Sequence, residues 1–439
     1  MTHAYPRHLA AFVTERWAEV APSRIRAGAR GSSGHLTLPD EGVLVRFISV
    51  CYQASLMREE ERQVTFRVIL INPDDLPEES GPPTGLHRLV FAAPRPFDED
   101  ELRRLSPAAD YHRSLIGVKA DENGSMSVWG IVQSGPRWIL RTQGGRDLSP
   151  PLPGVPVLHI SGPGRVEFRR GSRYVAKLES GELHGRPLDV FASKWLTESF
   201  FPARAELAEL HARAREGADE DWAPLDPDLT RMIGQHVVRR MISVLRDVHH
   251  GGTLVFIPPE RTEEFSHDNP YIAFKHRFED EEPRRRYRSL IVGVTNRLVE
   301  VHGKGGRDFY PRAVGWHEYQ TTNDPVIASL DEAIFELANL IAALAAVDGA
   351  VVLSKRYELL GFGAEISASL ERVHTVRRAL DHEGKRTVEE SVDGVGTRHR
   401  SAYRVVAAVP DAMAVVVSQD GSARFITRGP YGITYWNQA

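Results

Sequence analysis

The chain has a single cysteine, Cys51, among its 439 residues. One thiol forms no internal disulfide and no multi-cysteine zinc site, which excludes the disulfide-rich and cysteine-zinc classes of domain. This scarcity favours a reducing compartment. Because Cys51 lies beside an apolar, strand-like stretch, we expect it to be a small buried hydrophobe rather than a nucleophile.

Long hydrophobic runs are also missing. The most apolar long stretch, residues 335–347, contains Glu336 and ends before Asp348, so it is too short to cross a bilayer. The first residues lack the basic and apolar regions of a signal peptide. These features predict a cytoplasmic protein without a membrane partner.

Neither sign of charge dominates the chain. It contains 55 lysines and arginines against 59 acidic residues, and its formal net charge is −4. The hydrophobic fraction of 41% is close to that of soluble globular proteins, which excludes wholesale disorder. A protein that binds along a DNA duplex usually carries an excess of basic residues. Because this chain has no such excess, we expect no DNA partner.

Common catalytic motifs are absent as well. The chain has no Gly-x-Ser-x-Gly elbow, no His-Glu-x-x-His zinc helix and no P-loop. The glycine-rich run 303–306 lacks the P-loop spacing, and we interpret it as a loop. Any chemistry must therefore come from less familiar clusters of residues.

The sequence does contain alternating helical and strand-like segments, which predict an α/β fold. We expect a C-terminal domain with a mixed sheet and flanking helices, preceded by a separate mixed α/β domain. In the first half, residues 42–49 and 63–72 have strand composition, and residues 202–215 favour a helix. An acidic, proline-marked stretch at 217–224 follows, so we place the boundary between domains 1–222 and 223–439.

The second half shows the more regular pattern. Its helices and strands are expected at 228–249, 253–257, 351–354, 359–366, 396–408, 412–418 and 423–427. The last two strands are expected to form a hairpin around Asp420-Gly421. The charged run 279–286 is expected to be a solvated loop. The polar segment containing Leu370, Val373 and Val376 is expected to be a helix.

One cluster of chemistry-bearing residues, Gly396-Thr397-Arg398-His399-Arg400, stands at a predicted helix start. Free backbone N–H groups and the helix dipole favour an anion there, and the forked donors of arginine match phosphate oxygens. The pattern therefore predicts polyphosphate binding. The alternative is an ordinary helix start with a capping threonine and two exposed arginines.

A second cluster is Asp348-Gly349-Ala350, which leads into a predicted buried strand. A carboxylate beside a glycine at a strand edge can hold Mg²⁺ or Mn²⁺, or orient a hydroxyl, while the glycine lets a ligand approach the backbone. Because Asp-Gly also marks ordinary turns, this cluster alone is a weak signal.

Taken in this order, the two clusters resemble the signature motifs of the diadenylate cyclase (DAC) domain, Asp-Gly-Ala and Gly-Thr-Arg-His-Arg. An apolar helix before Asp348 and the strand 412–418 after the arginine motif are similar too. The resemblance covers about residues 228–427. It implies a facing homodimer or higher homo-oligomer in which two ATP molecules attack each other's α-phosphate through their 3′-hydroxyls. The products would be cyclic di-AMP and two pyrophosphates.

The same resemblance implies roles for individual residues. Asp348 would act in the metal or 3′-hydroxyl site, with Gly349 and Ala350 offering backbone contacts. His399 would lie at the phosphates or their metal, which is Mg²⁺ or Mn²⁺ bound with ATP. The other implied nucleotide-binding residues are Gly361, Phe362 and Gly363 near the adenine, Gly396, Thr397, Arg398 and Arg400 at the phosphates, and Ser418 after the next strand.

Three features depart from the family pattern. Residues 367–393 and 296–320 look like insertions, and Gln419 stands where the family tends to have a glutamate. These departures leave open a catalytically inactive nucleotide-binding sensor that keeps the same fold. A related nucleotidyl transfer with another nucleotide also stays open, because the motifs do not specify adenine.

In the N-terminal half, residues 52–60 and the β-branched run 64–71 resemble the DACNV class of sensor domains, which precede such cyclase domains in bacteria. The resemblance implies a sensor or regulatory role for residues 1–222, with a ligand or partner that the sequence does not identify. The alternative is an amphipathic helix in which Leu56 and Met57 simply face a core.

Overall fold

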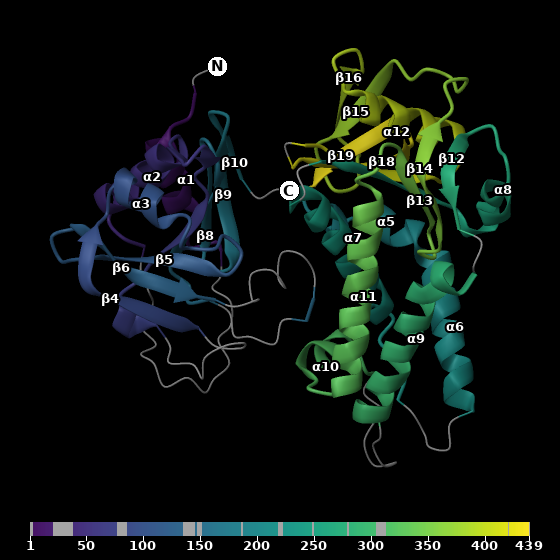
Figure 1. Cartoon of the computed structure of the whole chain (residues 1–439), viewed down its shortest axis with the longest axis horizontal. Coiled ribbons are helices and arrows are strands. Elements are labelled where there is room, and N and C mark those ends of the chain that lie inside the picture. Colours follow the sequence, from purple (N-terminus) through teal and green to yellow (C-terminus); the bar gives the residue numbers. More distant parts are fainter. Residues whose placement is uncertain are drawn as a thin grey trace. The chain divides into compact units, whose positions relative to one another are not determined.

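The computed structural model divides the chain into two compact units (Figure 1). Unit 1 comprises Met1–Arg141 and Asp147–Pro187, and unit 2 comprises Thr142–Arg146 and Leu188–Ala439. The structure describes residues 3–20, 38–76, 86–134, 145–146, 152–185, 188–217, 223–247, 250–278, 281–303, 313–419 and 421–438.

The boundary between the units lies earlier than the predicted position at 222/223. Val190, Phe191, Leu196 and Phe200 are buried in the apolar core of unit 2. Because these side chains pack there, the segment from Leu188 onward folds with the second unit. The predicted boundary at 222/223 therefore falls within the sequence range of unit 2.

Unit 1 is built on one mixed sheet with the strand order β10-β9-β8-β7-β3-β5-β6-β4. These strands are β3 (Phe66–Leu70), β4 (His87–Pro96), β5 (Ser114–Ala120), β6 (Met126–Gln133), β7 (Pro156–Gly162), β8 (Arg165–Arg170), β9 (Arg173–Glu179) and β10 (Glu182–His184). A short separate hairpin pairs β1 (Arg58–Glu59) with β2 (Arg62–Gln63). The helices are α1 (Pro6–Arg16), α2 (Glu41–Ser55) and α3 (Glu99–Leu105).

The strand predicted at 42–49 is wrong, because these residues belong to helix α2. Its buried residues Leu44, Phe47, Ile48 and Cys51 recur every three or four positions and face the core of unit 1. The predicted burial of Cys51 is confirmed, and burial raises the pKa of its thiol, which keeps the thiol protonated and unreactive. The strand predicted at 63–72 is confirmed in its central part as β3.

Unit 2 contains a second mixed sheet with the strand order β12-β14-β13-β11-β17-β18-β19-β15-β16. These strands are β11 (Gly252–Ile257), β12 (Ile272–Arg277), β13 (Ala350–Ser354), β14 (Leu359–Ile366), β15 (Thr375–Ala379), β16 (Thr387–Ser391), β17 (Met413–Val417), β18 (Ala423–Gly429) and β19 (Gly432–Gln438). The helices are α5 (Lys194–Ser199), α6 (Phe201–Glu216), α7 (Leu229–Asp247), α8 (Thr262–Ser266), α9 (Glu281–His302), α10 (Trp316–Thr321), α11 (Pro325–Leu344) and α12 (Thr397–Ala408).

The sheet of unit 2 has a different helical layer on each face. Alternate residues of β11 show the division: Leu254 and Phe256 join the core formed with α7, α9 and α11, whereas Val255 and Ile257 pack on the side of α12. The mixed α/β class predicted for this part of the chain is therefore confirmed, as are β11, β14, α12 and the β17–β18 hairpin.

Two predicted segments of unit 2 are wrong. Helix α9 begins at Glu281, so most of the charged run 279–286 is helical and not a loop. The segment around Leu370, Val373 and Val376 forms no helix, and Val376 lies in β15. Strand β15 pairs with β16 on one side and with β19 on the other. The predicted insertion 367–393 therefore adds β15 and β16 to the edge of the sheet.

A short segment that lies between β6 and β7 in sequence belongs to unit 2. The Arg146 guanidinium is buried, lies 3.3 Å from the Asp331 carboxylate on α11, and donates to the Thr322 carbonyl at 2.8 Å. Asp331 also accepts a hydrogen bond from the hydroxyl of Tyr319. The Gly145 N–H donates to Nδ1 of His236 on α7 at 2.9 Å. These contacts fix Gly145 and Arg146 against the helical layer of unit 2.

Candidate functional site

The Asp-Gly-Ala motif lies at the start of β13, beside the start of β11. The two strands are parallel, and Ala350 is paired with Thr253. Continuing this register places Asp348 opposite Gly251, about 5 Å away across the sheet. Asp348 and Gly349 are exposed, whereas Ala350 is buried, so the motif marks the point where the strand enters the core.

The arginine motif lies at the same end of the sheet. Gly396 is the N-cap residue of α12, and Thr397 is the first residue of that helix, as the sequence predicted. Arg398 donates from Nη1 to the carbonyl of His250 at 2.8 Å, immediately before Gly251. This bond holds the N-terminal turn of α12 over the start of β11.

Ser418 reaches the same position from the other side. Strand β17 runs antiparallel to β11, and Val417 is paired with Gly252, so Ser418 follows opposite Gly251. The backbone of Ser418 closes a turn with Ser422 and Gly421 at 2.8 and 2.9 Å. Asp348, Arg398 and Ser418, which lie far apart in the sequence, therefore surround the start of one central strand.

Gly349 brings Gly361-Phe362-Gly363 next to the motif. It has φ +120°, and a Cβ atom placed on it would lie 2.5 Å from the carbonyl carbon of Gly363. Only a residue without a side chain allows this approach of β13 to β14. Phe362 stacks on His276 with ring centroids 4.5 Å apart and is half-buried. Its predicted place near an adenine stays a prediction.

Replacing Gly349 with alanine is expected to lower the free energy of unfolding by about 2–3 kcal/mol, because it combines a left-handed φ with a backbone clash. Urea unfolding of the full chain measures the change. Gly394→Ala is the matched control, since a Cβ there meets nothing within 4 Å, and its effect should stay within about 0.5 kcal/mol. Equal unfolding midpoints for the two variants would contradict this account of Gly349.

One face of α12 borders a cationic hollow, with an empty volume of about 820 Å³ including its open mouth. The hollow is lined by Thr397, Arg400, Ser401 and Arg404 of α12 and by Arg372, Val373, His374, Val392 and Asp393 of the segment around the β15–β16 hairpin. None of its three arginines forms an ion pair with a carboxylate in the described part of the chain. Three guanidinium groups without counter-ions fit a phosphorylated ligand.

The first turn of α12 has no acidic residue, and Thr397, Arg398 and Arg400 stand in it. Cations at a helix start oppose the helix dipole, so this arrangement is unfavourable without an anion. Thr397 and Arg400 are exposed, with Arg400 Nη2 3.5 Å from the Thr397 hydroxyl. Both side chains can therefore turn toward a bound phosphate.

A metal ion would depend on the ligand as well as on the protein. No group of three or more His, Cys, Asp or Glu residues that could hold a metal occurs within the described ranges. Mg²⁺ commonly binds one or two carboxylates together with substrate phosphates and water, and the exposed Asp348 fits that mode. His399 is half-buried with its ring 6.4 Å from that of Tyr403, and its predicted metal role stays a prediction.

Sequence reasoning missed several charged residues at this end of the sheet. Lys275 on β12 pairs with Glu365 on β14 at 2.9 Å, and this hydrogen bond raises the pKa of Lys275, with a smaller effect from Asp348. Arg372, His374 and Arg404 of the cationic hollow were also missed. No sequence motif includes these residues. The pairing of β12 with β14 and the β15–β16 hairpin bring most of them to the site.

The described part of the chain contains no helix that is both long and apolar enough to cross a membrane. Residues 34–133 match the family model described as "Probable sensor domain DACNV". The matched range lies in unit 1 and includes the segment from α2 to β6. No curated protein and no solved structure matches the chain. This match supports a sensor domain of the DACNV class within unit 1, in agreement with the resemblance of residues 52–60 and 64–71.

Proposed function

We propose that unit 2 is a diadenylate cyclase that condenses two ATP molecules into cyclic di-AMP and two pyrophosphates, under the control of the sensor domain in unit 1. The observation that carries the proposal is the arrangement around Gly251. Asp348 lies on one side of it, Ser418 on the other, and Arg398 binds the preceding carbonyl. The two motifs that resemble the DAC signature thus meet at one exposed end of the sheet.

The chemistry of this end suits nucleotidyl transfer without a protein nucleophile. The 3′-hydroxyl oxygen of one ATP forms a bond to the α-phosphorus of the other, and the bond between that phosphorus and pyrophosphate breaks. The 3′-hydroxyl of the second nucleotide then attacks the α-phosphorus of the first in the same way, which releases the second pyrophosphate and closes the ring. Such transfer depends mainly on alignment and on neutralisation of phosphate charge. In this proposal the arginines of α12 and of the cationic hollow supply the positive charge, and Asp348 orients the attacking hydroxyl; the position of Asp348 beside the start of β11 supports this role. A bound Mg²⁺ or Mn²⁺ would neutralise phosphate charge further.

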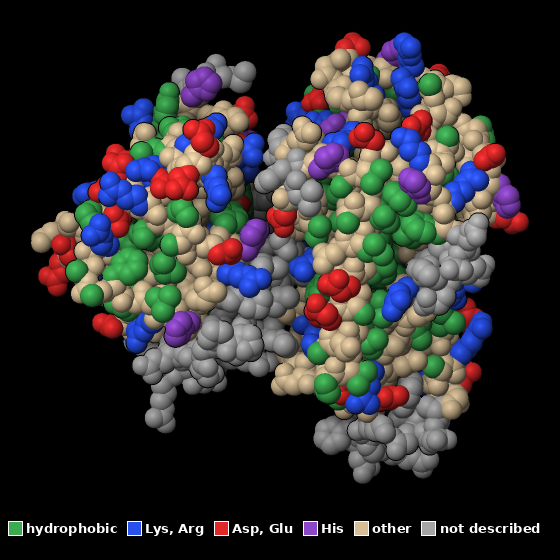
Figure 2. All heavy atoms as spheres, viewed as in Figure 1, with side chains coloured by type: hydrophobic (Ala, Val, Ile, Leu, Met, Phe, Trp, Pro, Cys, Tyr) green, Lys and Arg blue, Asp and Glu red, His purple; other side chains and the backbone are tan. Residues whose placement is uncertain are grey.

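The proposal needs a second copy of unit 2, because one copy aligns only one of the two nucleotides. Hydrophobic side chains cover the C-terminal half of α11, directly before Asp348 (Figure 2). Among them, Leu340 is 51% exposed, and Val347 after the helix is 41% exposed. Exposed apolar groups beside the proposed site fit a homodimer contact that brings two half-sites together.

The test is a competition among ATP, GTP, CTP and UTP in one reaction with the purified full chain and Mg²⁺ or Mn²⁺. The proposal predicts cyclic di-AMP as the main product. A cyclic product of another nucleotide would show a related nucleotidyl transfer instead. Tight ATP binding without any product, in a protein that stays monomeric in light scattering, would replace the proposal with a nucleotide-binding sensor.

A further inference from the structure

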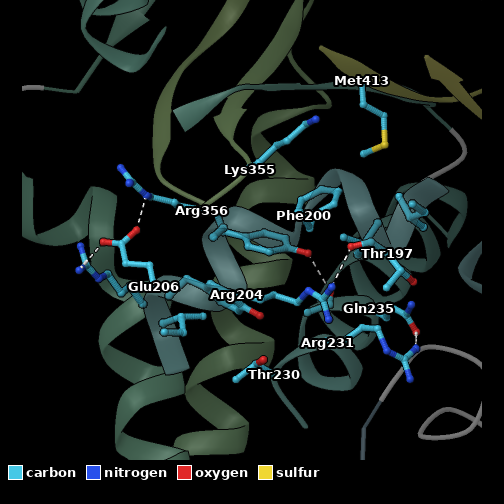
Figure 3. Close-up of a pocket in the computed structure, with 18 of the residues that line it drawn as sticks. Thr197, Phe200, Arg204, Glu206, Thr230, Arg231, Gln235, Lys355, Arg356 and Met413 are labelled. Carbon is cyan, nitrogen blue, oxygen red and sulfur yellow. Dashed lines mark hydrogen bonds and ion pairs between the residues drawn. The ribbon is translucent and has the colours of Figure 1, made fainter. Parts of the chain in front are cut away.

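A pocket (Figure 3) lies on the face of the unit 2 sheet opposite α12, because Met413 and Phe425 of its lining belong to the core formed with α7, α9 and α11. Its empty volume is about 700 Å³ including its mouth. Helices α5, α6, α7 and α9 form its walls, the turn after β13 closes one side, and Met413 and Phe425 come from the sheet. Asp348 stands at one end of β13 and Lys355 at the other. The seven extended residues from Asp348 to Lys355 place the pocket about 20 Å from the motifs.

The lining of this pocket, hereafter the α6–α7 pocket, is mainly aromatic and aliphatic. Tyr357 stacks with Phe200 at a centroid distance of 5.7 Å and lies 4.4 Å from Tyr287. Tyr357 has φ +61°, a conformation that is strained for a non-glycine residue, and its hydroxyl donates to the Gly234 carbonyl at 3.1 Å. The turn after β13 therefore holds an aromatic ring in the pocket at an energetic cost.

Most charged groups around the pocket neutralise one another. Glu206 pairs with Arg288 at 2.6 Å and with Arg356 at 2.5 Å. Arg231 pairs with Asp228 at 2.9 Å. These pairs leave two cationic side chains of the lining, Lys355 and Arg204, which come from the sheet side and from α6 respectively (Figure 3).

Lys355 is a buried cation, only 6% exposed, whose ammonium group donates to the Ser199 hydroxyl at 2.6 Å. Arg204 donates to the Thr197 carbonyl at 2.9 Å, while its Nε is buried and has no hydrogen-bond partner. In the described part of the chain neither cation forms an ion pair. Burial lowers the pKa of both side chains, and it outweighs the opposing effect of carboxylates that are too far away to form an ion pair, Asp228 for Arg204 and Asp411 and Glu260 for Lys355.

We propose that the α6–α7 pocket binds a small aromatic anion, such as an aromatic carboxylate, with its ring among Phe200, Tyr287 and Tyr357 and its acidic group toward Lys355 or Arg204. Such a ligand supplies the missing negative charge and buries an apolar ring in one event. Small-molecule sites combine a mainly apolar cavity with a few polar groups in this way. The site is distinct from the motif end of the sheet, and the proposal does not depend on cyclase activity.

The test uses two fluorescent probes of similar shape, the aromatic sulfonate 1-anilinonaphthalene-8-sulfonate and the uncharged N-phenyl-1-naphthylamine. The full chain is expected to bind the sulfonate saturably, at one molecule per chain. The double variant Lys355→Met/Arg204→Met should bind the sulfonate about tenfold more weakly or worse, because each substitution removes a charged partner from an apolar site. Binding of the uncharged probe should change little, because the aromatic lining is retained.

Lys355→Arg is the matched control, since it keeps the positive charge and should bind the sulfonate like the wild type. Thermal unfolding of each variant identifies a loss of fold. If a methionine variant does not fold, Ala203→Leu tests the same pocket by filling it, and it should weaken both probes. The proposal is overturned if the wild type shows no saturable sulfonate binding, or if the folded variants bind the sulfonate as tightly as the wild type.

Discussion

Replacing Asp348 with asparagine is expected to lower the rate of cyclic di-AMP formation at least about 100-fold, without a change in the fold. The carboxylate is exposed and stands at the proposed meeting point of the attacking hydroxyl and the metal-bound phosphates. Asparagine keeps the shape of the side chain but removes its charge and its capacity to accept a proton. Chromatography of the reaction products measures the rate, and circular dichroism verifies the fold.

Asp268→Asn is the matched control for this experiment. Asp268 is also an exposed carboxylate of unit 2, and it pairs with Arg277 at 3.0 Å on the surface. Surface pairs of this kind contribute little to stability, so the control should fold and react like the wild type. Full activity of Asp348→Asn would remove Asp348 from the proposed reaction.

Replacing Arg146 with methionine is expected to lower the free energy of unfolding of unit 2 by about 3 kcal/mol. The variant leaves the buried Asp331 carboxylate without its cationic partner while keeping most of the apolar volume of the side chain. Breaking a buried pair in this way costs more than the pair itself contributes, because one charge stays behind in the interior. Urea unfolding of the wild type and the variant measures the difference.

The pH dependence of that difference provides an independent check. Burial raises the pKa of Asp331, and Arg146 opposes this rise. Without Arg146 the pKa of Asp331 rises further above its unfolded value. A carboxyl group with a raised folded pKa favours the folded state at low pH, and this contribution is lost as the pH rises through the folded pKa. The deficit of Arg146→Met should therefore be smaller at about pH 4 than at about pH 8, and an equal deficit at both would contradict the ion-pair account.

Local patterns were sufficient to predict some elements of unit 2. The run that begins with Gly396 and Thr397 predicted the start of α12, and the Asp420-Gly421 turn predicted the β17–β18 hairpin. Residues 42–49 were misread because their many apolar and β-branched side chains suit a strand. Their buried positions recur with helical spacing, and packing of these side chains against the core of unit 1 stabilises the helix over a strand.

Features that depend on distant contacts could not be predicted. Arg146 meets Asp331, 185 positions later in the chain, and no local pattern links the two. The cationic hollow combines α12 with a segment that the sequence suggested to be helical, but whose pairing with β19 makes it part of the sheet. The two motifs themselves were visible in the sequence, but their meeting around Gly251 follows from the register of β11 with β13 and β17.

The most direct measurement of the central claim follows product and pyrophosphate together in one reaction of the full chain with ATP and Mn²⁺. If the motifs around Gly251 form half of a diadenylate cyclase site, each cyclic di-AMP should appear with two pyrophosphates. The specific rate should also rise with protein concentration until the facing dimer is saturated. Saturable ATP binding with neither cyclic di-AMP nor pyrophosphate at any protein concentration would contradict the account.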